Sequence, residues 1–434
     1  LVPEGSNLSE VIQLGKAIEQ AGASIINTGI GWHEARIPTI ATKVPRAAFT
    51  WVTHAVRKHL TVPVITSNRI NTPAVAERVL ANGDADLISM ARPFLADPEF
   101  VNKAAANQAE RINTCIGCNQ ACLDHVFNGK TSSCLVNPRA CEETRIIIAP
   151  TQAIKTIAIV GAGPAGLACA VTAAERGHKV TLYDAASEIG GQFNIAKRIP
   201  GKEEFSETLR YFEVRLAELN VEVKLNTSLT TQALNQMQVD ELVLATGVSP
   251  RQLALPGHNH AKVLNYLEVI KGVNVGPKVA IIGAGGIGFD VAEFLTHGTH
   301  EPSTNVTQFM SQWGIDMTMQ ARGGVAEIPQ NIEASPREIY LLQRKTSKVG
   351  AGLGKTTGWV HRTGLQQKKV NMLAGCEYQA IDDQGLHLTV GGEAQVLDVD
   401  HIIVCAGQDP NQSLSQGLER PYHLIGGAQK ASQL

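Results

Sequence analysis

The feature that most constrains the fold of this chain is a strand that runs directly into a glycine-rich turn and a helix. The apolar stretch 156–160 is followed by Gly-Ala-Gly-Pro-Ala-Gly at 161–166, and a second strand at 179–183 is followed directly by an acidic residue. Glycines allow the tight turn and the approach of a pyrophosphate to the helix N-terminus, and the acid can bind a ribose 2′-hydroxyl. We therefore predict a dinucleotide-binding unit rather than a fortuitous structural turn. Its candidate binding residues are Gly161, Gly163, Gly166 and Asp184.

The same pattern recurs at 278–288, which indicates an internal repeat of a nucleotide-binding unit. No acid follows at the corresponding distance; an insertion at 296–336 intervenes, and the next strand, 338–342, is followed by Gln-Arg-Lys. Cations in place of the ribose acid favour a 2′-phosphate and hence NADPH over NADH, although a solvated basic strand end is the simpler alternative. The candidate residues are Gly283, Gly285, Gly288, Arg344 and Lys345.

Residues 1–110 alternate between helix and strand patterns, and their short apolar strands are typical of parallel βα units. Such units close into a barrel only when eight strands are present. We therefore expect the last units of a (β/α)8 barrel, with roughly 200 residues of its front half absent. The expected helices are 9–21, 47–59 and 73–82, and the expected strands are 23–28, 62–66 and 85–90.

Between the barrel pattern and the first glycine turn lies a cysteine stretch with the spacing C-x2-C-x3-C-x11-C. Four soft thiolates this close together suit an iron–sulfur cluster or a structural zinc. Structural or redox-active thiols are a further interpretation. A disulfide framework is disfavoured, because the chain has only eight cysteines in 434 residues and no secretory pattern. The cysteines of the stretch are Cys115, Cys118, Cys122 and Cys134.

Composition excludes several classes of function. The formal net charge of -2 gives no basic field for nucleic acid, and 40 glycines with 5% aromatic residues favour an α/β architecture. No signal peptide is visible. The uncharged window 156–174 is interrupted by glycines and a proline, so we reject a membrane span there. We expect a cytoplasmic protein.

Two later strands, 242–246 and 402–406, each end in a glycine, a pattern typical of flavoproteins that bind two nucleotides. In such folds a helix directed at the flavin follows the segment near 423–427, so we expect the C-terminal end to be absent as well. The predicted domains are the barrel units (1–110), the cysteine segment and a linker (111–150), the first part of one nucleotide-binding domain (151–272), a second nucleotide-binding domain (273–390) and a truncated return to the first (391–434); the resemblance described next makes these an iron–sulfur segment, an FAD domain and an NADPH domain.

With these motifs in order, the chain resembles the old-yellow-enzyme-like multidomain reductases, and among them the bacterial 2,4-dienoyl-CoA reductases of the flavin and iron–sulfur type. The more specific signature is Asn-Thr-Gly-Ile-Gly-Trp-His-Glu-Ala-Arg-Ile-Pro at 27–38. The resemblance implies a barrel that binds FMN, a 4Fe-4S cluster, an FAD domain and an NADPH domain. It also implies that electrons pass from NADPH through FAD and the cluster to FMN, and then to a 2,4-dienoyl-CoA thioester.

The resemblance also assigns roles to individual residues. The four cysteines of the stretch become cluster ligands, and Cys141 is left as an ordinary thiol. His33 would assist protonation of the substrate. Without the resemblance, His33 would be interpreted as a polar loop residue, and Arg69 and Arg92 as solvated charges in loops. The residues expected to bind FMN are Arg69, Ala91 and Arg92, and those added for FAD are Ala165, Gly191, Gln192 and Gly247.

The resemblance therefore predicts an NADPH-dependent 2,4-dienoyl-CoA reductase of unsaturated fatty acid β-oxidation, with this chain inactive alone. Two alternatives remain open. One is a related flavin and iron–sulfur oxidoreductase of the enoate reductase or amine dehydrogenase type. The other is a non-enzymatic electron-transfer module. The sequence predicts no nucleic-acid or membrane partner and leaves the oligomeric state open, with a monomer compatible.

Overall fold

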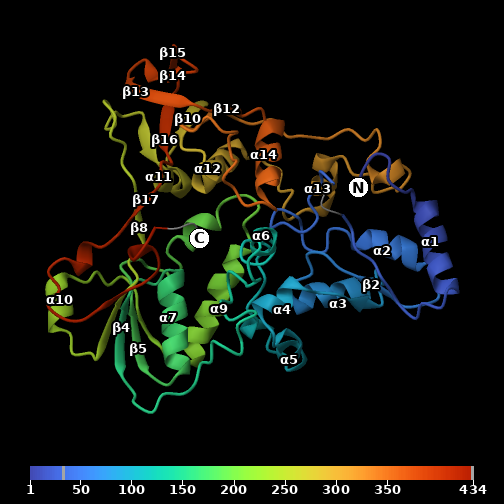
Figure 1. Cartoon of the computed structure of the whole chain (residues 1–434), viewed down its shortest axis with the longest axis horizontal. Helices are drawn as coiled ribbons and strands as arrows, with labels where there is room; N and C mark the ends of the chain where they lie inside the picture. The colour runs from blue at the N-terminus through green and yellow to red at the C-terminus, as the bar shows by residue number, and fades with distance from the viewer. Residues whose placement is uncertain (32–34, 432–434) are drawn as a thin grey trace.

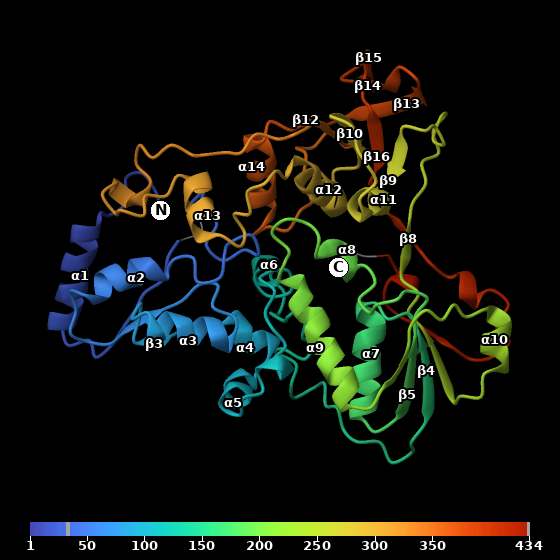
Figure 2. The same cartoon turned by 180° about the vertical axis from the view of Figure 1, so that it is seen from behind.

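The structure is a computed structural model that describes residues 1–31 and 35–431. Three α/β units surround a cysteine-rich segment (Figures 1 and 2). The N-terminal segment, coloured blue, lies on one side of the molecule, and the unit coloured green lies beside it. The yellow-to-orange unit lies above the green one, and its inserted helix reaches back to the N-terminal segment.

The strands of the N-terminal segment pair in parallel, as the alternation of helices and strands predicts. Ile26 is paired with Val64, and Ile65 with Leu87, so the strands end at a common edge. The first helix is capped by Asn7, whose side chain accepts from the backbone of the third helical residue in a capping box. The elements are α1 (Leu8–Gln20), β1 (Ile26–Asn27), α2 (Thr50–Arg57), β2 (Val64–Thr66), α3 (Pro73–Ala81), β3 (Leu87–Ile88), α4 (Arg92–Ala96) and α5 (Phe100–Ala105).

The cysteine segment follows with little regular structure. It contains η1 (Ala109–Arg111) and α6 (Leu123–Phe127), and the rest of the segment consists of loops.

The first nucleotide-binding unit is a parallel sheet in the order β18-β7-β4-β5-β6. Side chains of its strands alternate between two faces. Val243 packs with the helices α7 and α9 on one face, whereas Leu242 and Leu244 pack with Leu234 of α10 on the other. The elements are β4 (Thr156–Val160), α7 (Pro164–Glu175), β5 (Lys179–Tyr183), α8 (Phe193–Ala196), α9 (Phe205–Glu218), β6 (Glu222–Lys224), α10 (Thr231–Gln236), β7 (Glu241–Leu244), β8 (Val248–Pro250), β17 (Gln408–Pro410), η3 (Ser413–Ser415), β18 (His423–Leu424) and η4 (Gly426–Ala428).

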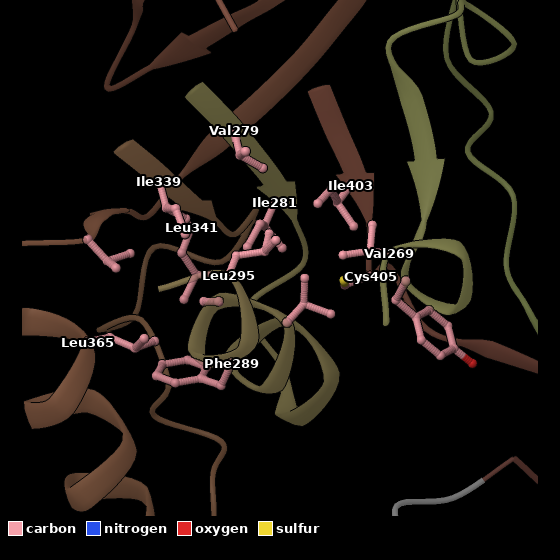
Figure 3. Packing of buried hydrophobic residues seen from close by; sticks show 14 of the residues in the cluster. Val269, Val279, Ile281, Phe289, Leu295, Ile339, Leu341, Leu365, Ile403 and Cys405 are labelled. Carbon is pink, nitrogen blue, oxygen red and sulfur yellow. The ribbon is translucent and has the colours of Figure 1, made fainter. Parts of the chain in front are cut away.

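The second nucleotide-binding unit repeats this plan with the strand order β12-β11-β10-β16-β9. Figure 3 shows Val279 and Ile281 of the central strand packed against Phe289 of the following helix. The opposite face is covered by an antiparallel sheet in the order β13-β14-β15. The elements are β9 (Val263–Asn265), α11 (Tyr266–Lys271), β10 (Lys278–Ile282), α12 (Gly286–Thr296), α13 (Val306–Trp313), η2 (Arg322–Gly324), β11 (Glu338–Leu342), α14 (Gly358–Gln367), β12 (Asn371–Leu373), β13 (Cys376–Asp382), β14 (Gly385–Val390), β15 (Glu393–Leu397) and β16 (His401–Val404).

The chain passes between the two units at positions that differ from the predicted boundaries of 272 and 391. Both β9 and β16 belong to the second sheet, where Ile403 is paired with Leu264. The crossing points are therefore the antiparallel strands β8 and β17, which pair Pro250 with Gln408. Long-range strand pairing, which leaves no local signal in the sequence, causes this difference.

The predicted insertion between α12 and β11 packs on the N-terminal segment. Phe309 of α13 meets Phe49 edge to face, with ring centroids 6.2 Å apart, inside a cluster that also contains Val44 and Trp313. The second nucleotide-binding unit is thus joined to the barrel-type segment through a shared apolar core. Within the part of the chain that the structure describes, no helix has the length and apolar character to cross a membrane.

Candidate functional site

The first glycine turn has the backbone geometry of a nucleotide-binding loop. Gly161 adopts a φ of +110°, and a Cβ there would lie 2.3 Å from the carbonyl oxygen of Ala245. A Cβ on Gly166 would lie only 1.8 Å from the carbonyl oxygen of Gly161, so this glycine lets α7 pack close to the strand. By contrast, a Cβ on Gly163 would meet no protein atom within 4 Å. The open side of the loop is where a pyrophosphate would approach.

Several of the residues predicted to bind the nucleotide surround this loop. The N-cap Gly163 makes no side-chain cap, which leaves the N-terminal amides of α7 available to an anion. Asp184 accepts from the backbone N–H of Ala162 at 2.6 Å, so its carboxylate fixes the glycine turn. A Cβ on Gly191 would lie 3.0 Å from the Cα of Gly163, which places this glycine beside the loop, directly before Gln192. The contact of Asp184 with a ribose stays a prediction.

The returning C-terminal segment closes the same site. A Cβ on Gly426 would lie 2.5 Å from the Cβ of Ala165 in the first turn of α7. A Cβ on Gly427 would lie 3.2 Å from the carbonyl carbon of Gly247, which itself adopts a φ of +72°. Ala165 and Gly247, both predicted to meet the nucleotide, therefore lie together at the start of α7.

The second glycine turn repeats the first closely. Gly283 has a φ of +112°, and its Cβ position lies 2.4 Å from the carbonyl oxygen of Cys405. A Cβ on Gly288 would lie 1.8 Å from the carbonyl oxygen of Gly283, whereas a Cβ on Gly285 would face open space. Two repeated distances and the same open face at the middle glycine are what a second nucleotide site at the N-terminus of α12 would need.

The predicted recognition cations of this second site are exposed on the loop after β11. Arg344 and Lys345 are both solvent-accessible. The side-chain amide of Gln343 donates to the carbonyl oxygen of Lys345 at 3.0 Å and to that of Ser347 at 2.5 Å, which holds the loop. The two cations are exposed on this loop, and their contact with a phosphate stays a prediction.

The four cysteines of the C-x2-C-x3-C-x11-C stretch face one small cavity. Cys115 is buried, and the other three thiols are half-buried. Within the described ranges, no three His, Cys, Asp or Glu side chains converge on a point suited to a single metal ion. The cavity is lined by Arg92, Leu95, Cys115, Ile116, Cys118, Asn119, Cys122, Cys134, Leu135 and Val136.

Hydrogen bonds from the barrel-type segment shape the loop that carries the first cysteines. Asn71 donates to the carbonyl oxygen of Cys115 at 2.8 Å, and the hydroxyl of Thr42 donates to that of Ile116. The guanidinium of Arg92 donates to the side-chain oxygen of Asn119 at 2.5 Å. These bonds satisfy buried polar groups of a loop that has no secondary structure of its own.

The thiols interact with one another through their charges. Burial raises the pKa of Cys118 to about 12, and the neighbouring thiols of the cavity raise it further. Burial likewise raises the pKa of Cys134 to about 11 and also raises that of Cys122, which the charge of Arg92 opposes. Several thiolates in one apolar cavity require positive charge, which iron or zinc would supply. Four cysteines around one cavity fit the ligand set of an iron–sulfur cluster, and the same donors also suit zinc.

The residues predicted to bind FMN lie next to this cavity. Arg69 has a left-handed φ of +55° and is buried, and it donates to the carbonyl oxygen of Val44 and to Glu204. Arg92 begins α4, directly after Ala91, and lines the cysteine cavity itself. Their contact with a flavin stays a prediction, and His33 lies outside the described residues.

Two buried carboxylates between units carry no signal that singles them out in the sequence. Glu204, at the start of α9, accepts hydrogen bonds from Arg46 and Arg69 of the barrel-type segment. Glu293 of α12 binds Lys43 and lies 2.8 Å from Nδ1 of His361. Although burial alone would raise the pKa of Glu293, these two partners lower it to about 2. A carboxylate in a helix or at a helix start is too common for sequence reasoning to select either residue.

A barrel-type segment followed by two Rossmann-like units, the second inserted into the chain of the first, defines the class of modular flavin- and pyridine nucleotide-dependent oxidoreductases. The chain belongs to the pyridine nucleotide-disulphide oxidoreductase family, which matches residues 155–425. Residues 1–111 match the NADH:flavin oxidoreductase / NADH oxidase family. The predicted fold class is thereby confirmed, and the two matches support FMN, FAD and NAD(P) as cofactors.

Similarity to individual proteins extends along nearly the whole chain. A metal reductase of Desulforamulus reducens is 34% identical over 93% of this chain and 60% of the relative. Cinnamate reductase of Clostridium sporogenes is 27% identical over 99% of this chain and 60% of the relative. The structure of 2-naphthoyl-CoA reductase with 2-naphthoyl-CoA matches with a TM-score of 0.86 and 26% identity, covering 98% of this chain and 60% of that chain. The chain thus spans about 60% of the length of these relatives. The old-yellow-enzyme-like resemblance agrees with the match of residues 1–111 to the NADH:flavin oxidoreductase / NADH oxidase family.

Proposed function

We propose that the protein is an NADPH-dependent flavin and iron–sulfur reductase that acts on a conjugated, unsaturated acyl thioester, in the manner of a 2,4-dienoyl-CoA reductase. The observation that carries this proposal is the placement of four cysteine thiols around one cavity between the barrel-type segment and the first nucleotide-binding unit. The similarity to reductases of cinnamate and of 2-naphthoyl-CoA supports a conjugated acid or thioester as the substrate class.

The residues of this chain would prepare each site for its cofactor. When bound, FAD, a 4Fe-4S cluster and FMN would together convert the two-electron chemistry of NADPH into single-electron steps and back. Cys115, Cys118, Cys122 and Cys134 would hold the cluster, and the amides at the start of α7 would hold the FAD pyrophosphate. Arg344 and Lys345 would select the 2′-phosphate of NADPH.

Within the cysteine site, apolar side chains form part of the lining around the thiols. Leu95, Ile116, Leu135 and Val136 cover the cavity, and Arg92 places one positive charge at its edge. A cluster with four thiolate ligands carries net negative charge, so this guanidinium would favour its more reduced form.

The test measures the rate of NADPH oxidation by the full-length protein after reconstitution with its flavins and iron. We expect substrate-dependent NADPH consumption with a 2,4-dienoyl-CoA thioester and none with secondary or tertiary amines. Turnover with an amine and not with the thioester would instead assign the protein to the amine dehydrogenase type. Reduction of ferricyanide without turnover of either substrate would identify an electron-transfer module.

A further inference from the structure

Glu204, at the start of α9, connects the first nucleotide-binding unit to the barrel-type segment. Its carboxylate accepts two hydrogen bonds from Arg46, at 2.7 and 2.6 Å, and one from Arg69 at 2.7 Å. Asn71 donates a fourth at 3.1 Å. The side chain of Glu204 is only 7% exposed, so a charge there is tolerated because every partner is present.

The partners of Glu204 also contact the loop with the first two cysteines. The side-chain amide of Asn71 donates to the carbonyl oxygen of Cys115 at 2.8 Å as well as to Glu204. The guanidinium of Arg69 lies against Gly117, where an added Cβ would come within 2.9 Å of its Nη1. One carboxylate thus fixes two side chains, and those two side chains fix the backbone on both sides of Ile116.

The same helix holds the cysteine segment at a second point. Arg210, on the second turn of α9, donates to the carbonyl oxygens of Glu110 and Ile112 and to the hydroxyl of Thr114. Between Glu204 and Arg210, the apolar side chains of α9 pack on Ile116. The cysteine loop is therefore held against α9 at both ends. At one end the carboxylate of Glu204 binds the side chains that contact the loop, and at the other Arg210 binds its backbone.

We propose that Glu204 is a positioning residue for the four-cysteine site, acting through Asn71 and Arg69 on the loop that carries Cys115 and Cys118. This role rests on the proposed function only for the identity of the group bound by the four cysteines, an iron–sulfur cluster. The contacts of Glu204 with Asn71 and Arg69 do not depend on that group. Loss of the carboxylate charge leaves Arg69 buried and without its anionic partner. The arginine then moves, and the 115–118 loop loses its fixed position.

The first test is alkylation of each cysteine in the metal-free, reduced chain, followed by mass spectrometry. In Glu204→Gln we expect Cys115 and Cys118 to react about tenfold faster than in the wild type, a factor that corresponds to about 1.4 kcal/mol of easier local opening. Cys169 of α7 is the internal reference and should keep its rate. The matched control is Glu213→Gln, which removes an exposed carboxylate of the same helix. Glu204→Asp, which keeps the charge, should bring the rates back toward the wild type.

Equal labelling of Cys115 in Glu204→Gln and Glu213→Gln would overturn the proposal. If Glu204→Gln does not fold, Asn71→Ala decides in its place, since it removes the donor to Cys115 and leaves the arginine pairs intact. Faster labelling of Cys115 in that variant supports the proposal, and an unchanged rate overturns it.

The second test uses the iron-loaded chain and separates this proposal from the proposed function. Glu204→Gln should change the electron paramagnetic resonance spectrum and release iron to a chelator several times faster than Glu213→Gln. If the wild-type chain takes up no iron, the cluster assignment fails, while the labelling result still decides the role of Glu204.

Discussion

Replacing Gly166 with alanine should destabilise the first nucleotide-binding unit, although alanine is the better helix former. Helix propensity alone would stabilise α7 by about 1 kcal/mol. The new Cβ, however, would lie 1.8 Å from the carbonyl oxygen of Gly161, far inside van der Waals contact with a backbone atom that cannot rotate away. Overpacking of this kind costs about 1–3 kcal/mol. The clash should therefore exceed the propensity gain.

Gly163 provides the matched comparison, because it lies in the same turn with the opposite surroundings. Its backbone, with φ -75° and ψ 178°, suits alanine, and no protein atom lies within 4 Å of the Cβ position. Alanine is a poorer N-cap residue than glycine, so this replacement should itself cost about 0.5–1 kcal/mol. The new methyl group would also occupy the side of the turn where the pyrophosphate approaches. We expect at least tenfold weaker FAD binding, or about 1.4 kcal/mol.

The assay separates these two effects. Thermal unfolding is measured on flavin-free protein, because bound FAD would itself raise the transition temperature. Gly166→Ala should lower the unfolding temperature by about 2–8 °C, and Gly163→Ala should lower it less than Gly166→Ala does, by about 1–4 °C. FAD titration should then show weakened binding in both variants. A Gly166→Ala protein that unfolds at or above the wild-type temperature would refute the reasoning, as would a Gly163→Ala protein with unchanged FAD affinity.

Three further predictions follow from the contacts between units and from the second glycine loop. The pKa of Glu293 lies below its unfolded value, so this carboxylate should stabilise the fold above about pH 4.5 and lose that contribution as the pH falls toward 2. In Glu293→Gln, the free energy of unfolding should therefore depend less steeply on pH between about 4.5 and 2. An unchanged slope would contradict the assignment. The double variant Arg344→Ala/Lys345→Ala should raise the KM for NADPH about tenfold and leave that for NADH nearly unchanged, whereas equal losses would favour a solvated basic loop. Phe309→Ala should lower the stability of the chain by about 3–5 kcal/mol, measured by denaturant unfolding, and a loss below about 1 kcal/mol would show that the insertion does not share a core with the N-terminal segment.

The sequence predicted those parts of the fold that depend on local patterns. The glycine turns were predicted because one strand, three glycines and a helix lie within a few residues of each other, and the structure gives both turns nearly the same geometry. The βα alternation of the first 110 residues was predicted for the same reason, and its strands do pair in parallel. The four cysteines were grouped by spacing, and they do line one cavity.

Contacts between distant segments could not be predicted in this way. Glu204 lies in a Lys-Glu-Glu run before a helix, where an acid ordinarily interacts with the helix dipole, and nothing local indicates its contact with Arg69. The insertion gave no sign that Phe309 packs on Phe49, because apolar periodicity shows that a helix has a buried face but not what covers it. The sheet that contains β16 was decided by pairing with β9 and β10, far apart in the chain.

The central claim is that Cys115, Cys118, Cys122 and Cys134 hold an iron–sulfur cluster beside an FAD site. Its most direct test is the iron, acid-labile sulfide and flavin content of the chain after anaerobic purification or reconstitution. We expect about four irons and about four sulfides per chain, and their loss when Cys118 is replaced by serine. One zinc per chain, with neither iron nor sulfide, would contradict it.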